Sequence, residues 1–374
     1  MIPPDAQAAW GEAQRVLCIR LDGMGDVLMS TPAIRALKQA RPGRRVALLA
    51  SSSGAALAPF LPDVDTVLPY ECAWVRNGQS GNQADMQAIQ RIRAWRPEAA
   101  VIFTVYSQSP LPAALLCHLA GVPRVLAHCR ENPYRLIGDW VRETDTDASM
   151  RHEVQRQLDL VAAVGVRAAD TSLSFQVRER DRQALRARVR TMGVADGEDW
   201  IAVHGGATAA SRRYPAPLLA RAIARLRGEG RRIVLLGSPE DGGLDAALPA
   251  LRAQLPGLID LSGQLTLGEL GAAIERCAVL VCNNSGPAHI AAALHVPVVD
   301  LYALTNPQHT PWNTAHRLLY HDVPCRNCYR SVCPQGHHAC LAQVRPERVA
   351  EAAHELLAAA SPREATQGRL ACIR

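Results

Sequence analysis

The stretch of residues 278–304 is the sequence feature that most constrains how this chain can fold. It reads A-V-L-V-C-N-N-S-G-P-A-H-I-A-A-A-L-H-V-P-V-V-D-L-Y-A-L. A short apolar, β-branched run breaks at a turn over residues 283–287, an alanine-rich helical segment follows, and a second apolar run covers residues 296–301. The pattern predicts a β-turn-α-β unit of an α/β protein.

The turn before that predicted helix has the features of an anion-binding site. Ser285 or Gly286 can cap the helix and Pro287 suits its first turn, so several backbone N–H groups lack an intrahelical partner. Such amides can bind an anion. His289, in the first turn, adds a cationic or hydrogen-bonding side chain. An ordinary capped crossover helix with a structural histidine is an equal alternative at this point.

Length and composition favour two α/β domains. A chain of 374 residues exceeds what one compact core usually holds. Aromatic residues make up only 4% of the chain while alanine, valine and leucine dominate, which is typical of helices packed on parallel strands. The net charge of +6 favours anionic small molecules or an acidic membrane surface as partners. No basic cluster is interleaved with aromatic residues, so we expect no nucleic-acid partner.

The sequence has no pattern of a signal peptide or a membrane span. Residues 1–14 carry Asp5 and Glu12 and have neither the basic region nor the apolar region of a signal peptide. No uninterrupted apolar run is long enough to cross a bilayer. We therefore expect a cytoplasmic protein.

Apolar runs alternate with amphipathic segments along most of the chain. The alternation predicts doubly wound parallel sheets with right-handed crossovers, in two Rossmann-like domains. The expected strands cover residues 15–22, 44–51, 66–70, 99–104 and 124–128 in the first domain, and residues 200–204, 232–237, 258–261, 278–282 and 296–301 in the second.

We place the first domain at residues 1–175 and the second at residues 176–345, with a cysteine-rich loop at residues 325–340. A C-terminal helix and tail follow at residues 346–374. In open α/β sheets, ligands bind outside the carboxyl ends of the strands. We therefore expect a ligand in a cleft between the two domains.

The turn after the first predicted strand, D-G-M-G-D, lacks the third glycine of a dinucleotide-binding G-x-G-x-x-G motif, because Leu28 takes that position. Gly23, Met24 and Gly25 instead form a turn that presents Asp26 at the start of a helix. The helix dipole stabilises a carboxylate there, and such a carboxylate can accept a proton from an attacking hydroxyl. A capping aspartate without chemistry is the alternative.

Loops of the second domain carry side chains that suit a nucleoside diphosphate. Thr208 follows a strand and a pair of glycines, and its hydroxyl can donate to a phosphate oxygen. Arg212 and Arg213 can neutralise a diphosphate, because a guanidinium pairs with phosphate in a bidentate fork. Glu240 follows the next strand and can accept hydrogen bonds from a ribose or a base. A solvated arginine pair at a helix entrance is the alternative.

Four cysteines gather in the loop at residues 325–340 with the spacing C-x2-C-x4-C-x6-C. Four thiolates with two histidines beside them can close a tetrahedral zinc or iron site. A reduced loop and a disulfide pair are the alternatives, and the second is disfavoured in a cytoplasmic protein. The candidate ligands of a structural metal are Cys325, Cys328, Cys333 and Cys340.

These pieces together resemble glycosyltransferase family 9, the heptosyltransferase family. The matching pieces are the run R-V-L-C-I-R-L-D-G-M-G-D-V-L-M-S-T-P-A-I-R-A-L, His152 before a helix, the segment R-R-Y-P, the run V-C-N-N-S-G-P-A-H-I-A-A-A-L and the cysteine loop. The resemblance covers about residues 15–359. It implies the GT-B fold of two facing Rossmann-like domains, a nucleotide-activated sugar donor, most often ADP-heptose, and an acceptor sugar of the lipopolysaccharide core.

The resemblance also implies roles for single residues. Asp26 is the general base for the acceptor hydroxyl, on the acceptor-side turn described above. Helix amides and a histidine hold the donor diphosphate, a threonine and an arginine support the same phosphates, and a glutamate lies near the nucleoside. The implied donor-binding residues are Thr208, Arg212, Glu240, Asn284, Ser285, Gly286 and His289.

Two positions depart from the family pattern. The family usually has aspartate where this chain has Asn284, and lysine where it has Arg212. The missing carboxylate bears on the contact to a sugar or ribose hydroxyl, and therefore on the identity of the donor. Arginine keeps the charge of lysine but changes its geometry.

The resemblance implies an inverting displacement that requires no cofactor. Asp26 would activate the acceptor from the first domain, while amides and Arg212 stabilise the leaving diphosphate from the second, and closure would exclude water. A glycolipid acceptor implies peripheral association with the cytoplasmic face of the inner membrane. The alternatives are another nucleotide-sugar, a protein acceptor, or a catalytically weak sugar-nucleotide-binding homologue. The absent third glycine argues against a nicotinamide-dependent oxidoreductase.

Overall fold

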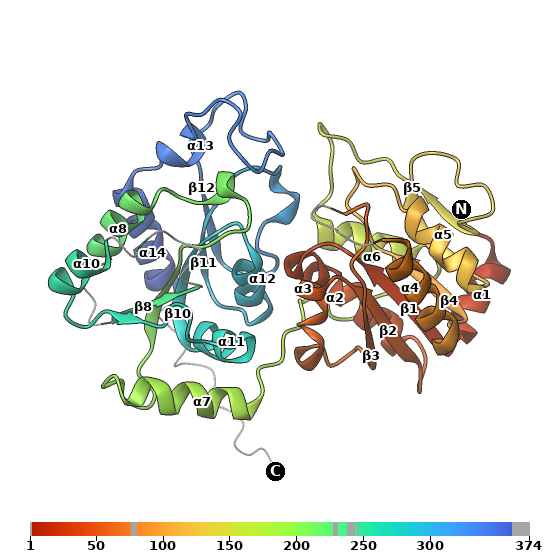
Figure 1. Ribbon diagram of the computed structural model, residues 1–374, viewed down its shortest axis with the longest axis horizontal. Coiled ribbons are helices and arrows are strands. Elements are labelled where there is room, and N and C mark those ends of the chain that lie inside the picture. The colour runs from red at the N-terminus through yellow and green to blue at the C-terminus, as the bar shows by residue number, and fades with distance from the viewer. Residues whose placement is uncertain (1, 76–80, 227–230, 238–243, 245–246, 361–374) are drawn as a thin grey trace, which may run out of the picture. The chain divides into compact units, whose positions relative to one another are not determined.

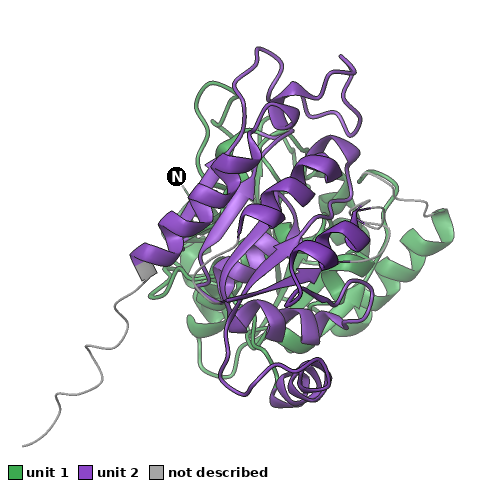
Figure 2. Ribbon diagram, turned by 90° about the vertical axis from the view of Figure 1, so that its left-hand side faces the viewer, with its two compact units in different colours: residues 1–178, 306–312 green, residues 179–305, 313–374 purple. Residues whose placement is uncertain are grey.

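The chain folds into two compact units, each built around one sheet. The computed structural model describes residues 2–75, 81–226, 231–237, 244 and 247–360 (Figure 1). Unit 1 comprises residues 1–178 and 306–312, and unit 2 comprises residues 179–305 and 313–374 (Figure 2). The short segment 306–312 therefore belongs to unit 1 although the chain on both sides of it belongs to unit 2.

Unit 1 contains a parallel six-stranded sheet in the order β3-β2-β1-β4-β5-β6. The order reverses at β1, which pairs with β2 on one side and β4 on the other. This is the doubly wound topology, in which ligands bind at the reversal. The strands are β1 (Arg15–Arg20), β2 (Arg45–Ala50), β3 (Thr66–Pro69), β4 (Ala99–Ile102), β5 (Val125–Cys129) and β6 (Asp139–Arg142).

Helices pack on the sheet of unit 1 because its central strands β1, β2 and β4 are buried on both faces. In β1, alternate residues Leu17 and Ile19 belong to a core cluster that also holds residues of α4 and α5. Helices α2 and α6 of this unit also pack against each other. The helices of unit 1 are α1 (Pro4–Glu12), α2 (Met24–Gln39), α3 (Ser52–Ala55), η1 (Ala58–Phe60), α4 (Asn82–Trp95), α5 (Leu111–Ala120), α6 (Glu153–Ala162) and η3 (Pro307–His309).

Unit 2 repeats the topology of unit 1. Its parallel sheet has the order β12-β11-β10-β7-β8-β9, so the reversal lies at β7, between β10 and β8. The loops that leave β7 and β10 therefore start side by side at the carboxyl edge. The strands are β7 (Trp200–His204), β8 (Arg232–Leu236), β9 (Ile259–Asp260), β10 (Cys277–Asn283), β11 (Val298–Leu301) and β12 (His316–Leu319).

The core of unit 2 lies between this sheet and a helix pair. Ile201 and Val203 of β7 pack with apolar residues of α8 and α14, which also contact each other. The helices of unit 2 are α7 (Glu179–Arg190), η2 (Ala210–Arg212), α8 (Ala216–Arg225), α10 (Leu248–Gln254), α11 (Leu267–Arg276), α12 (Gly286–Ala293), α13 (Ala339–Ala342) and α14 (Pro346–Ala360).

The predicted pair of parallel, doubly wound sheets is confirmed. The strands β6 and β12 and the helices α1, α10, α13, η2 and η3 were not predicted. The two strands carry a weak apolar pattern, since β6 reads D-W-V-R and β12 reads H-R-L-L. The first strand ends at Arg20 rather than Asp22, because α2 already begins at Met24. Among the described residues, no helix combines the length and the apolar character needed to cross a bilayer.

Candidate functional site

Asp26 lies at the start of α2, directly after the strand at the reversal of the first sheet. Its Oδ2 accepts a hydrogen bond from the backbone N–H of Gly23, the N-cap residue, at 3.2 Å. Its Oδ1 accepts one from Nη2 of Arg20 at 3.0 Å. The side chain is 25% exposed. The carboxylate is thus held at two points and still open to solvent, beside the half-buried Met24 and Gly25.

Arg20 holds three carboxylates at once from a fully buried position. Besides its bond to Asp26, its Nη1 donates to Oε1 of Glu153 at 2.7 Å, and its Nε lies 3.0 Å from Oδ2 of Asp22. Glu153 is buried as well. Burial raises the pKa of Asp22 to about 6. The positive charge of Arg20 lowers this pKa, and the negative charge of Asp26 raises it. Sequence reasoning missed this cluster, whose one signal is an arginine, Arg20, at the end of an apolar strand.

The predicted anion-binding turn lies between β10 and α12. Ser285 is the N-cap residue of α12, yet its hydroxyl donates to the backbone oxygen of Asn283 at 3.1 Å and makes no capping bond to the helix. Gly286 is the first helical residue and is half-buried, and His289 is buried in the same turn. The N-cap side chain therefore does not compete with a ligand for the amides of the first turn.

Asn284 makes contacts within the protein that an aspartate could not make. It is 3% exposed, and its Nδ2 donates to Oγ1 of Thr305 at 3.2 Å and to the backbone oxygen of Ala303 at 3.5 Å. A carboxylate has no N–H to offer these two acceptors. The amide at this position therefore binds the turn that follows β11.

Asn283 joins the two loops of the candidate donor site, and sequence reasoning missed it. The side chain has no exposed surface. Its Nδ2 donates to the backbone oxygen of Gly205 at 2.7 Å, and its Oδ1 accepts from the N–H of Tyr214 at 3.0 Å. The signal in the sequence is a polar residue at the end of a buried strand. This one amide fixes the loop after β7 against the turn after β10.

The loop after β7 brings two predicted phosphate ligands to the same edge. Thr208 is exposed and Arg212, at the end of η2, is half-buried. Arg213 differs, because its Nε donates to the backbone oxygen of Ala207 at 2.7 Å and so supports the loop. Since β7 pairs with β10, these residues and the turn at 284–289 gather at the reversal of the second sheet. Glu240 lies outside the described residues.

A buried carboxyl group lies within reach of the Arg212 charge. Asp300, in the middle of β11, has no exposed surface, and neither of its carboxyl oxygens has a hydrogen-bond partner among the described residues. Burial raises the pKa of Asp300 to about 8, against the lowering effect of Arg212. On the neighbouring strand it faces Cys282 in register. Sequence reasoning did not single out Asp300.

The four loop cysteines are half-buried and free, with no disulfide among them in this structure. Burial raises the pKa of the Cys340 thiol and the other three cysteines raise it further, so the four lie in one neighbourhood. Cys325 Sγ is 4.0 Å from Nε2 of His337. Within the described ranges, however, no three His, Cys, Asp or Glu side chains are grouped closely enough to hold a metal ion. The loop in this arrangement does not form the closed tetrahedral site that the spacing predicts.

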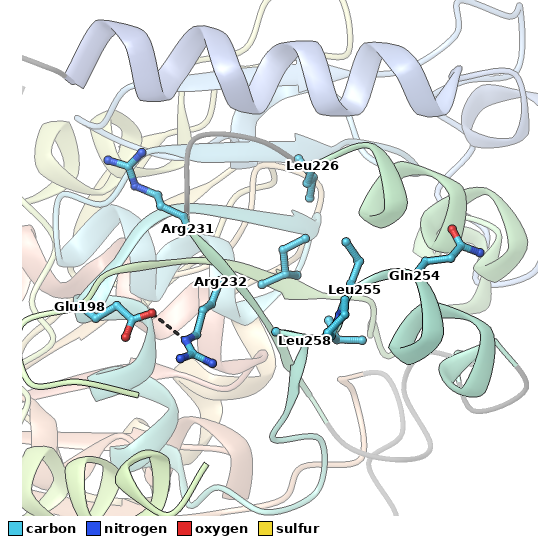
Figure 3. Close-up of a pocket in the computed structure, with 10 residues that line it drawn as sticks. Glu198, Leu226, Arg231, Arg232, Gln254, Leu255 and Leu258 are labelled. Atoms are coloured by element: carbon cyan, nitrogen blue, oxygen red, sulfur yellow. Dashed lines mark hydrogen bonds and ion pairs between the residues drawn. The ribbon is translucent and has the colours of Figure 1, made fainter. Parts of the chain in front are cut away.

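A pocket elsewhere in unit 2 does not fit a substrate site. It is lined by residues at the start of β8 and before β9 (Figure 3). Its charged residues are already paired, since Arg232 donates to Glu198 at 2.7 Å and Arg231 lies 3.1 Å from Asp199. Because the lining residues lie at the start of β8 and before β9, the pocket opens at the amino ends of these strands. Ligands of such sheets bind at the opposite, carboxyl edge.

Comparison with known proteins matches more than half of this chain to one family model. The family model of glycosyltransferase family 9 (heptosyltransferase) matches residues 107–339. Lipopolysaccharide heptosyltransferase 2 of Salmonella typhimurium is 26% identical over 365 residues, which cover 92% of this chain and 98% of that protein.

Two solved structures share the two-sheet fold. The family 9 glycosyl transferase of Veillonella parvula has a TM-score of 0.74 and 22% identity, covering 92% of this chain and 98% of the other. ADP-heptose LPS heptosyltransferase II of E. coli has a TM-score of 0.69 and 23% identity, covering 92% and 99%. The predicted GT-B fold class is thereby confirmed.

Proposed function

Because this chain belongs to glycosyltransferase family 9 (heptosyltransferase), we propose that it transfers a heptose from ADP-heptose to a sugar of the lipopolysaccharide core. The donor and the acceptor are those in the names of its relatives from Salmonella typhimurium and E. coli. The proposal assigns the acceptor to residues 1–175 and the donor to residues 176–345. A lipid-linked acceptor also implies that the enzyme meets a membrane surface, which its net charge of +6 favours.

The observation that carries the catalytic assignment is the placement of Asp26. It is a half-buried carboxylate, held by Arg20 and by the N-cap amide, at the reversal of the first sheet. In the proposed step, Asp26 takes the proton of the acceptor hydroxyl as its oxygen forms a bond to the anomeric carbon. The bond from that carbon to the diphosphate breaks, and ADP leaves with the electron pair, so the configuration inverts.

The leaving diphosphate needs positive charge and hydrogen-bond donors at the second sheet. The first-turn amides of α12, the Arg212 guanidinium and the Thr208 hydroxyl supply them in this proposal. His289 completes the set, and Glu240 is assigned to the nucleoside. Asn284 supports the turn after β11 and is assigned to the donor side through that contact. These residues stabilise the developing charge without a metal cofactor.

The donor experiment compares binding of ADP-, GDP-, UDP- and CMP-sugars to the purified protein by calorimetry. The proposal expects ADP-heptose to bind best and to yield ADP and a glycosylated acceptor when a heptose-accepting core oligosaccharide is added. Preference for another nucleotide supports a family member with a different donor. Tight ADP-heptose binding without turnover supports the catalytically weak homologue.

A structural zinc or iron at the cysteine loop is a separate question, because the donor chemistry above does not depend on it. Four thiols in one neighbourhood favour a metal, whereas their present spacing does not. Metal analysis of protein purified without chelator decides between the two. The hypothesis requires about one zinc or iron per chain, bound by Cys325, Cys328, Cys333 and Cys340.

A further inference from the structure

Ser211 uses all of its polar groups to bind the cysteine loop. Its N–H donates to the backbone oxygen of Ser331 at 2.9 Å, and its hydroxyl donates to that of Arg330 at 2.5 Å. Its own carbonyl accepts a hydrogen bond from Nε2 of His338 at 2.8 Å. Ser211 is 5% exposed, so these three bonds form away from bulk solvent. The residue that follows it in the chain is Arg212.

The same loop also holds the turn after β11. The N–H of Tyr329 donates to the backbone oxygen of Leu304 at 3.0 Å. Leu304 has a φ of +78°, in the left-handed region that a leucine rarely adopts, so the turn needs support from its surroundings. Asn284 binds Ala303 and Thr305, on either side of Leu304. The cysteine loop therefore contacts both segments that carry or support candidate donor ligands.

Backbone fixation matters most for an arginine that pairs with a diphosphate. A bidentate pair requires the planar guanidinium in one orientation, and ordering a long side chain at the moment of binding costs affinity. Here the backbone beside Arg212 is fixed by the loop through Ser211. This fixation is in place before a ligand arrives.

We propose that the cysteine loop is a positioning element for the donor, in which Ser211 and His338 hold Arg212 ready for the diphosphate of a nucleoside diphosphate. This inference rests on the proposed function, because it takes Arg212 as a donor ligand. It gives the cysteine loop a role in ligand affinity, whether or not the loop binds a metal.

A double-mutant cycle on the full chain tests the proposal, with the dissociation constant of ADP as the readout. Ser211→Ala and His338→Ala each weaken ADP binding, by roughly tenfold, because one buried hydrogen bond is lost. In an Arg212→Ala background, Ser211→Ala causes no further loss, since Ser211 acts through Arg212. His338→Gln keeps an N–H donor and restores most of the affinity.

Ser331→Ala is the matched control. Ser331 contributes only its backbone oxygen to Ser211, so its substitution leaves the contact intact and ADP binding unchanged. The KM for the acceptor stays constant in all these variants, which separates positioning from general loss of structure.

Two results would overturn the inference. Unchanged ADP affinity in Ser211→Ala and His338→Ala shows that the cysteine loop does not position Arg212 for the donor. An equal loss of affinity with and without Arg212 shows that the loop acts by another route. By contrast, an Arg212→Ala variant that binds ADP as tightly as the unaltered protein refutes the donor assignment in the proposed function, and the inference with it.

Discussion

Arg20 stands between Asp26 and Glu153, with Nη2 3.0 Å from Oδ1 of Asp26 and Nη1 2.7 Å from Oε1 of Glu153. The guanidinium is fully buried, so Glu153 compensates a charge that would otherwise lie in the core without an acidic partner on that side. Glu153, on α6, therefore helps to position the proposed base Asp26, on α2, through Arg20. The two carboxylates are 127 positions apart in the chain.

Loss of Glu153 should destabilise unit 1. Glu153→Ala leaves Arg20 buried with fewer partners, and breaking such a pair costs about 3–5 kcal/mol. Chemical denaturation followed by circular dichroism measures the free energy of unfolding. The control is Glu12→Ala, which removes a 79% exposed partner of Arg41 and should change the free energy of unfolding far less, because solvent screens an exposed ion pair. Similar losses in the two variants would contradict the role given to Glu153.

Asp22 should produce an inflection near pH 6 in the activity profile. Burial raises its pKa to about 6, so the carboxylate is ionised above that pH and gains a proton below it. Protonation removes a negative charge beside Asp26, which makes Asp26 a weaker base, and kcat should fall as the pH drops through about 6. Asp22→Asn should lose this inflection. A profile with the same inflection in both proteins would rule out Asp22 as its source.

Asp300 should make stability depend on pH. Its pKa is about 8 in the folded chain and near 3.8 when unfolded, so the folded state holds the proton more tightly. The resulting stabilisation is present below pH 3.8, declines as the pH rises, and is lost above about pH 8. Asp300→Asn cannot ionise at this position, so its denaturation midpoint should fall less between pH 5 and pH 8 than the midpoint of the unaltered protein. If the two proteins lost the same stability between pH 5 and pH 8, Asp300 would not be a source of the pH dependence.

Asn284→Asp should not improve the enzyme, although it restores the usual family residue. The aspartate cannot donate to Ala303 or Thr305 and places negative charge beside a backbone oxygen. We expect a loss of about 1–3 kcal/mol in stability and weaker ADP-heptose binding. Thermal unfolding and calorimetry measure the two effects. Tighter donor binding in Asn284→Asp would show that the position contacts the ligand directly.

The sequence predicts those features that arise from neighbouring residues. Apolar runs of β-branched residues identify most strands, and the turns that carry Asp26 and Ser285 follow from a strand, a glycine and a helix start within a few positions. The parallel sheets follow from this local pattern, whereas the placement of both turns at the sheet reversals depends on the order of the strands, which the sequence did not predict.

Contacts between distant residues could not be predicted. Arg20 meets Glu153, and Ser211 meets His338 more than a hundred positions away, by geometry that no local pattern encodes. His152 is part of the family resemblance, but the sequence did not predict what its side chain does. Its Nδ1 accepts from the N–H of Val154 and caps α6, so its Nε2 carries the hydrogen that it donates to the backbone oxygen of Thr310 at 2.9 Å. That bond helps attach the segment 306–312 to unit 1.

The most direct test of the account is a comparison of the unaltered protein with Asp26→Asn in two assays, ADP-heptose binding and transfer to a core acceptor. Asparagine keeps the size of the side chain but cannot accept the proton. The account predicts unchanged donor affinity and a loss of turnover of roughly 10²- to 10⁴-fold. Normal turnover in Asp26→Asn would contradict it.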